Sequence, residues 1–189
     1  MNLNDQIFLA INNLSLLNIG ILNFFCIFVA LFSPYIYALG LVIVYLSNRK
    51  KQALCVFYVA LIGLSINFLI GIFYYHPRPF VEGLGNLLIP HAKDSSFPSD
   101  HATLAFAISF GFWYAKEKTI SIISFIFAII TGFARVFVGV HFPFDIVGSF
   151  FVAIVALTLL NAFVAYFSKV SDFLIKLQIR IFNMFGLNI

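Results

Sequence analysis

Residues 21–46 of the chain read ILNFFCIFVALFSPYIYALGLVIVYL. This stretch carries no charged side chain, and it exceeds the roughly 20 residues that an α-helix needs to cross the hydrocarbon core of a bilayer. The backbone finds no water inside that core, so an apolar segment of this length satisfies its own hydrogen bonds as a helix. The stretch therefore predicts a transmembrane helix.

The rest of the chain repeats this pattern. Of its 189 residues, 10% are charged and 62% are hydrophobic, and the mean hydropathy is +1.05. Further apolar runs cover residues 53–74, 101–115, 119–138 and 144–167, of which 101–115 is the shortest. We expect an all-α fold, a polytopic transmembrane helical bundle of about five to six helices. Residues 1–189 then form a single integral-membrane domain, without a separate soluble module.

The two ends of the chain have a different pattern. Residues 1–20 mix Asn, Asp5 and Gln6 with apolar residues at helical spacing, which favours a helix in the membrane interface or a short first crossing. Residues 170–189 place apolar side chains on one stripe and Lys176 and Arg180 on another face, so we expect an interfacial C-terminal helix. The N-terminus lacks the positive region and the small-residue cleavage site of a removed signal peptide.

The two cysteines, Cys26 and Cys55, lie in apolar runs and far from any metal-ligand spacing. We interpret them as inert buried thiols, which do not identify a redox compartment. The net charge is only +4. We expect membrane lipids, and no nucleic acid, as partners.

The basic residues predict how the chain is oriented. If five spans alternate, one side receives most of the basic residues: Arg49, Lys50, Lys51, Lys116, Lys118, Lys169, Lys176 and Arg180. By the positive-inside rule, that side is cytoplasmic. The other side receives three basic residues, Arg78, Lys93 and Arg135, and all four histidines, His76, His91, His101 and His141. Polar groups gathered at membrane depth indicate a functional site, here at the outer face.

These outer residues fall into three short clusters. They are HPRPF at residues 76–80, PSDH at residues 98–101, and ARVFVGVHFPFD at residues 134–145. Each cluster stands at the outer end of a predicted helix, so packing of the bundle can bring the three together.

The second cluster predicts an anion site. Ser99 or Asp100 caps the following helix, whose N-terminal N–H groups and positive dipole end then face outward, with His101 in the first turn. Arg78 and Arg135 add planar, permanently charged forks that match phosphate oxygens. Together these features favour the binding of a tetrahedral anion at the N-terminus of this helix.

The third cluster supplies a candidate nucleophile. His141 and Asp145 are four residues apart, so they meet on one face if a helix begins near Pro143. A carboxylate on one imidazole nitrogen makes the other nitrogen a better nucleophile. His101 can then donate a proton to the leaving oxygen, and this division of labour needs no metal.

The three clusters, in this order, resemble the signature of the type 2 phosphatidic acid phosphatase family, which includes the vanadium haloperoxidases. The family pattern is Lys, six residues, Arg-Pro; then Pro-Ser-Gly/Asp-His; then Ser-Arg, five residues, His, three residues, Asp. This sequence supplies Arg78-Pro79, residues 98–101, and Arg135, His141 and Asp145 at the required spacings. It departs at Gly71, where the family has Lys, and at Ala134, where the family has Ser.

The resemblance implies a role for each matching residue. His141 would attack phosphorus and form a phosphohistidine, with Asp145 orienting it. His101 would protonate the leaving oxygen and then activate water, and the phosphoryl oxygens would be held by Arg78, Ser99 and Arg135. No metal and no cofactor are implied. The missing Lys implies either weaker binding of phosphate or reliance on Arg78, Arg135 or His76 in its place.

Within the family, the motifs HPRPF and SFPSDHA look most like those of the small bacterial undecaprenyl-diphosphate phosphatases of the bacitracin-resistance type. The resemblance implies hydrolysis of that lipid carrier of cell-wall peptidoglycan synthesis at the outer face of a bacterial cytoplasmic (inner) membrane. Phosphatidylglycerophosphate, phosphatidate and lipid A phosphates stay open as substrates.

The sequence is also compatible with roles for further residues and with other functions. His76 and Asp100 are possible substrate-binding residues, whereas His91 and Lys93 are interpreted as interfacial side chains of a polar loop. A metal-dependent hydrolase would use His101, His141, Asp100 and Asp145 as ligands. A serine protease using Ser99 and His101, and a transporter or proton channel, are the alternatives from other classes. The sequence leaves the oligomeric state open.

Overall fold

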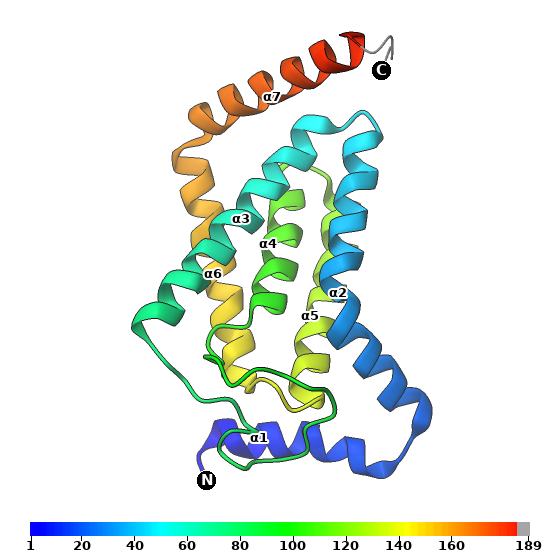
Figure 1. Ribbon diagram of the computed structural model, residues 1–189, viewed down its shortest axis with the longest axis vertical. Coiled ribbons are helices and arrows are strands. Elements are labelled where there is room, and N and C mark those ends of the chain that lie inside the picture. The colour runs from blue at the N-terminus through cyan, green and yellow to red at the C-terminus, as the bar shows by residue number, and fades with distance from the viewer. Residues whose placement is uncertain (185–189) are drawn as a thin grey trace.

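The computed structural model describes residues 1–184, and these residues form helices and connecting loops without any strand (Figure 1). The elements are α1 (Leu3–Asn12), a 3₁₀-helix η1 (Asn13–Leu17), α2 (Gly20–Leu46), α3 (Lys50–Phe73), α4 (Asp100–Tyr114), α5 (Lys118–Phe137), α6 (Pro143–Ala162) and α7 (Val164–Met184). The predicted all-α bundle is confirmed, with α2 to α6 as its five members. Four of these, α2, α3, α5 and α6, are long and apolar enough to cross a membrane.

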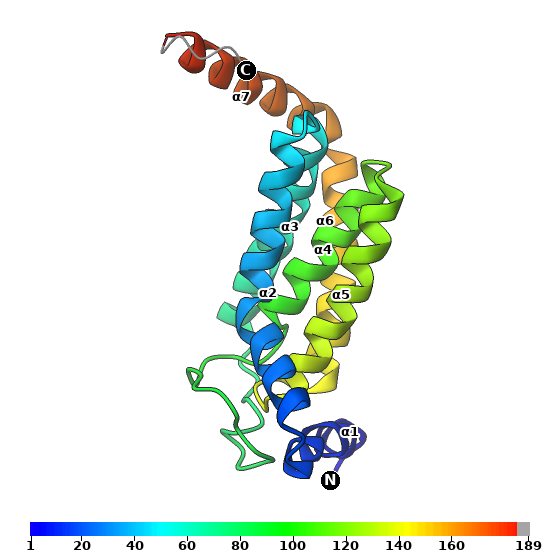
Figure 2. The same ribbon diagram turned by 90° about the vertical axis from the view of Figure 1, so that its right-hand side faces the viewer.

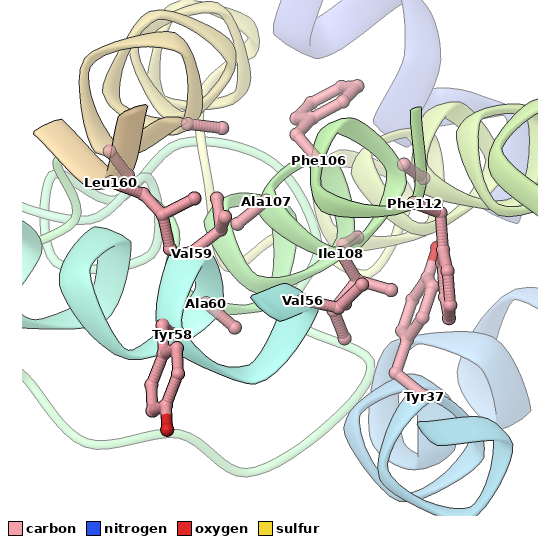
Figure 3. Close-up of a cluster of buried hydrophobic side chains, with 14 of the residues drawn as sticks. Tyr37, Val56, Tyr58, Val59, Ala60, Phe106, Ala107, Ile108, Phe112 and Leu160 are labelled. Carbon is pink, nitrogen blue, oxygen red and sulfur yellow. The ribbon is translucent and has the colours of Figure 1, made fainter. Parts of the chain in front are cut away.

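Helix α4 lies at the centre of the bundle and packs against its four neighbours. Small residues allow this close approach: a Cβ added at Gly111 would stand 2.9 Å from the Cα of Val56 on α3. Around them a buried cluster joins α2, α3, α4 and α6, including Tyr37, Val59 and Leu160 (Figure 3).

The short length of α4 creates the space for a site. Its 15 residues span roughly 22 Å, less than the roughly 30 Å of a bilayer core. Its outer end therefore stops short of the outer ends of its longer neighbours. The loop of residues 74–99 folds over this end (Figure 1).

Helices α1 and α7 lie at opposite ends of the bundle (Figure 2). With 10 residues, α1 is too short to cross a bilayer, and it packs beside α5 and α6 beneath the loop of residues 74–99. Helix α7 begins at Val164, earlier than the interfacial helix expected over residues 170–189, because the helical run breaks at Phe163. The final part of that expectation, residues 185–189, lies outside the described residues.

One buried amide fastens α1 to the last residue of α5 and to the loop of residues 74–99. The Asn12 side chain donates to the backbone oxygens of Phe137 (2.8 Å) and Asn86 (2.9 Å), and it accepts from the N–H of Asn86 (2.6 Å). Close to it, Gly139 has φ +84°, and an added Cβ would stand 2.3 Å from the Asn86 oxygen. The contact thus joins the loop of residues 74–99 to the turn that precedes His141.

Replacing Asn12 by Ala should destabilise the protein by about 3 kcal/mol, because buried backbone groups lose their partner. The melting temperature in detergent measures this. Asn13→Ala is the matched control, since Asn13 is exposed. Equal melting temperatures for the two variants would contradict the proposed importance of the buried Asn12 side chain.

Candidate active site

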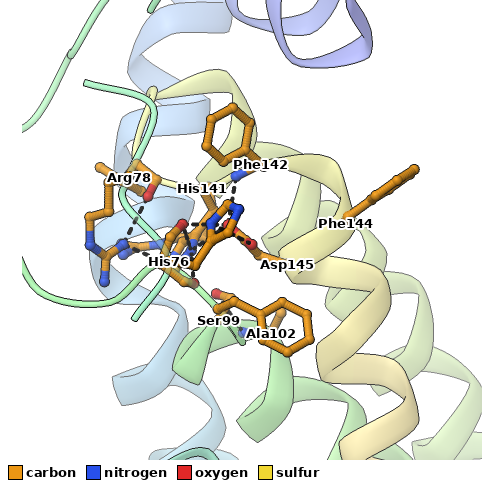
Figure 4. A network of polar contacts seen from close by, with 12 residues as sticks. His76, Arg78, Ser99, Ala102, His141, Phe142, Phe144 and Asp145 are labelled. Atoms are coloured by element: carbon orange, nitrogen blue, oxygen red, sulfur yellow. Dashed lines mark hydrogen bonds and ion pairs between the residues drawn. The ribbon is translucent and has the colours of Figure 1, made fainter. Parts of the chain in front are cut away.

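The structure brings the three sequence clusters together at the end of the bundle that lies opposite α7 (Figure 4). Arg78 comes from the loop of residues 74–99, Arg135 from the last turn of α5, and His141 from the turn between α5 and α6. Ser99 caps α4 and Asp145 lies in the first turn of α6. All five side chains are buried.

His141 is held between a group that only accepts and a group that only donates hydrogen bonds. Its Nδ1 lies 2.9 Å from the backbone oxygen of Ser96, which can only accept. Its Nε2 lies 3.2 Å from Nη1 of Arg78, which can only donate. These neighbours require the proton on Nδ1 and leave the lone pair on Nε2, the form that a nucleophilic imidazole needs.

Burial, together with the charges of Arg135 and Arg78, lowers the pKa of His141 to about 3, although Asp145 opposes this shift. The imidazole is therefore neutral at physiological pH. A neutral ring is consistent with the tautomer that its two neighbours require.

Asp145 lies beside Nδ1 of His141, at 3.4 Å. Its Oδ2 also accepts from the N–H of Phe142 (2.7 Å), which caps α6, and from the hydroxyl of Ser96. The carboxylate is thus fixed by the helix start on one side and by the loop of residues 74–99 on the other.

Ser96 belongs to this network of contacts although the sequence analysis did not identify it as a site residue. It is fully buried, its carbonyl contacts His141, and its hydroxyl contacts Asp145. The only sequence signal was its position two residues before Pro98, inside the stretch SFPSDH.

Arg78 is the centre of a second set of contacts. Besides His141, its Nη1 donates to the oxygen of Val140 (2.8 Å), its Nη2 to the oxygen of Ser95 (3.1 Å), and its Nε to the carboxylate of Asp94 (2.8 Å). The guanidinium therefore connects the loop of residues 74–99 directly to the turn that carries His141.

Arg135 anchors α5 to α2 and faces a histidine. Its Nη1 donates to the backbone oxygen of Ala30 (3.0 Å) and its Nη2 lies 2.9 Å from Nε2 of His91, while its buried Nε–H has no partner among the described residues. The interpretation of His91 as an interfacial side chain is therefore wrong, because its half-buried ring points inward at Arg135. A buried donor without a partner is available to an anion.

The start of α4 forms one wall of a cavity of about 570 Å³. Ser99 accepts from the N–H of Ala102 (3.5 Å), so the predicted cap is Ser99. His101 lines the cavity, and so does Asp100, whose exposed carboxylate accepts from Asn67 (2.9 Å). Gly71, where the related family has Lys, also lines the cavity, and a Cβ added there would meet no atom within 4 Å.

His76 lies at the edge of the network. Its Nδ1 is buried, has no hydrogen-bond partner within the described part of the chain, and stands 4.0 Å from Oδ1 of Asp145. Its ring packs edge-on against Phe142.

Within residues 1–184, no three His, Cys, Asp or Glu side chains are grouped as metal ligands, so His101, His141, Asp100 and Asp145 do not form the ligand set of a metal-dependent hydrolase.

Replacing Ser96 by Ala should lower kcat for phosphate release from a lipid phosphate by about 10- to 100-fold, with a small change in KM. Asp145 loses a hydrogen bond of the charged class, which is worth about 1.5–3 kcal/mol. Ser109→Ala is the control, because Ser109 is equally buried and donates only to the oxygen of Ser121 on α5. An equal loss in both variants would mean that the effect is structural.

The lowered pKa of His141 predicts a loss of stability in acid. The unfolded chain binds a proton near pH 6.5 whereas the folded ring stays neutral, so the free energy of unfolding falls as pH drops below about 6.5. At about pH 5 the loss from this one group is about 2 kcal/mol. The stability difference between the native protein and His141→Gln, measured by melting in detergent, should shift by this amount between about pH 7.5 and about pH 5. Parallel pH profiles would contradict the assignment.

Comparisons with known proteins agree with this geometry. The model of the PAP2 superfamily matches residues 52–169. Undecaprenyl-diphosphatase BcrC of Bacillus subtilis is 38% identical over 184 residues, which cover 96% of this chain and 94% of that protein.

Solved structures share the fold. LpxE of Aquifex aeolicus superposes with a TM-score of 0.72 and 26% identity, covering 84% of this chain and 94% of the other. A PAP2 type phosphatidylglycerolphosphate phosphatase of Bacillus subtilis superposes with a TM-score of 0.64 and 21% identity, over 88% of each chain. The chain therefore belongs to the PAP2 superfamily and is a hydrolase embedded in a membrane.

Proposed function

We propose that this protein is a metal-independent lipid phosphatase that converts undecaprenyl diphosphate to undecaprenyl phosphate and inorganic phosphate through a phosphohistidine on His141. The proposed mechanism is supported chiefly by one contact, in which Nε2 of His141 lies 3.2 Å from Nη1 of Arg78. A phosphoryl group on Nε2 of His141 would lie beside a fixed positive charge. The choice of lipid rests on the similarity to BcrC along nearly the whole chain.

In the first step, Nε2 of His141 attacks the terminal phosphorus. A nitrogen–phosphorus bond forms and the bond from phosphorus to the bridging oxygen breaks, with its electron pair moving to that oxygen. His101, on the wall of the cavity, donates a proton to this leaving oxygen. Asp145 and the carbonyl of Ser96 stabilise the positive charge that develops on the ring.

In the second step, His101 removes a proton from water, and the water oxygen attacks the phosphohistidine. The nitrogen–phosphorus bond breaks, its electrons return to Nε2, and phosphate leaves. Arg78, the free Nε–H of Arg135 and the N-terminus of α4, capped by Ser99, stabilise the phosphoryl oxygens in both steps.

The cavity beside His101 suits a lipid substrate. Its polar end carries Asp94, Asp100 and His101, while Pro34 of α2, several residues of α3 and Leu104 of α4 form apolar walls. Phe68 and Ile72, on the α3 wall, are 71% and 58% exposed at the outer surface of the bundle, where lipid chains lie. We infer that the first isoprenoid units occupy the apolar part.

The site is proposed to face the exterior of a bacterial cytoplasmic membrane. Basic residues concentrate at the opposite end of the bundle, around the α2–α3 and α4–α5 connections and on α7. Interfacial placement of α1 and α7 fits the same arrangement.

A second candidate substrate is another phosphorylated membrane lipid. The superposition on LpxE extends over 94% of that chain, and the polar end of the cavity, with Asp94, Asp100 and His101, is proposed to face the phosphate rather than the lipid chain. A phosphatidylglycerophosphate, phosphatidate or lipid A phosphate would undergo the same two steps with a different leaving group.

Purified protein in detergent with a chelator should release phosphate from undecaprenyl diphosphate, and His141→Ala should lower this rate by at least about 1,000-fold. Rapid acid-free quenching with terminally labelled substrate should trap label on the native protein and none on the variant. A melting temperature near that of the native protein confirms that the variant is folded.

Each outcome has a separate meaning. Release from phosphatidylglycerophosphate but not from undecaprenyl diphosphate would overturn the substrate. Full activity of His141→Ala, or native activity that the chelator abolishes, would overturn the mechanism.

A further inference from the structure

The phosphate-binding arginine already holds an anion that belongs to the protein. Nε of Arg78 lies 2.8 Å from Oδ1 of Asp94, while its other contacts are to His141 and to the neutral backbone oxygens of Val140 and Ser95. Asp94 is the one carboxylate paired with Arg78 among residues 1–184. In the free site, then, a carboxylate occupies a donor that a phosphoryl oxygen would use.

Asp94 stands where the substrate must pass. It lines the same cavity as His101, and its side chain is 61% exposed, whereas that of Arg78 is 5% exposed. An exposed carboxylate can leave a buried guanidinium when a phosphoryl oxygen takes its place on the same donor, since water then replaces the contact that the carboxylate loses.

The same loop also covers the second arginine. Nε2 of His91 lies 2.9 Å from Nη2 of Arg135, and its Nδ1 lies 3.7 Å from Oδ1 of Asp94. The four side chains form a continuous row, Arg78, Asp94, His91 and Arg135. Residues 91–94 thus contact both proposed phosphate cations.

Asp94 is charged in this arrangement. Partial burial would raise the pKa of its carboxyl, but the hydrogen bond and charge of Arg78, with a contribution from His91, lower it below the usual value. A charged carboxylate is a direct competitor of a phosphate dianion for the same donor.

We propose that Asp94 is an internal competitor for phosphate: it pairs with Arg78 in the free enzyme, yields to the substrate phosphoryl group, and returns to Arg78 to help expel the product phosphate. The inference rests on the proposed function in one respect, the use of Arg78 to bind phosphate. It assigns Asp94 a role in product release rather than in the chemical step.

A purely structural role makes the opposite prediction. If Asp94 only holds Arg78 in position, its removal loosens the arginine and weakens anion binding. If Asp94 competes, its removal frees the Nε–H and tightens anion binding. The sign of the change therefore separates the two.

The test uses full-length protein in detergent, with inorganic phosphate and orthovanadate as probes. Asp94→Asn keeps the shape of the side chain but removes its charge, and it should lower the inhibition constants of both anions by at least about threefold. Glu82→Gln removes an exposed negative charge from the same loop without any ion pair to Arg78, and its inhibition constants should stay near the native values.

Unchanged or raised inhibition constants in Asp94→Asn would overturn the proposal. An equal decrease in Glu82→Gln would overturn it too, because overall charge would then explain the effect. Direct titration of the native protein with vanadate, followed by vanadium NMR without any lipid, keeps this result separate from the proposed function. Native protein that binds vanadate but hydrolyses no lipid phosphate would overturn the proposed function. The affinity of Asp94→Asn for vanadate would still decide the role of Asp94.

Discussion

A buried, permanently charged guanidinium determines the arrangement of the outer end of this protein. Arg78 cannot lose its charge, so the surrounding chain must supply acceptors on every side. The loop of residues 74–99 provides Ser95 and Asp94, and the turn after α5 provides Val140 and His141. Satisfying one arginine thus brings His141, the proposed nucleophile, and the covering loop to the same place.

The helices make this arrangement possible by differing in length. A short, central α4 leaves its N-terminus and His101 below the outer ends of the longer α2, α3 and α6. The polar groups lie within the bundle, where each one needs a partner. The buried contacts of Asn12 and Ser96 supply such partners, one outside the catalytic group and one within it.

The sequence predicted the parts of this structure that depend on local pattern. Apolar runs predicted α4 and α5 to within about one residue, and the spacing of His141 and Asp145 correctly predicted that the two side chains meet where α6 begins. The break at Phe163 was missed because the residues on both sides of it are equally apolar.

The sequence did not predict contacts made by the irregular loop of residues 74–99. His91 meets Arg135 across 44 positions, and Ser96 meets His141 across 45. No periodicity records such pairs, since the loop's path depends on tertiary hydrogen bonds to Arg78 and Asn12 rather than on its own pattern.

The exposed apolar wall of the cavity has a consequence for how a lipid substrate would reach the site. A substrate that enters from the bilayer arrives by diffusion in two dimensions, so the rate of encounter follows its mole fraction among the surrounding lipids or detergent molecules. Diluting the lipid substrate with more detergent, at a fixed amount per volume, would then slow turnover although the enzyme itself is unchanged.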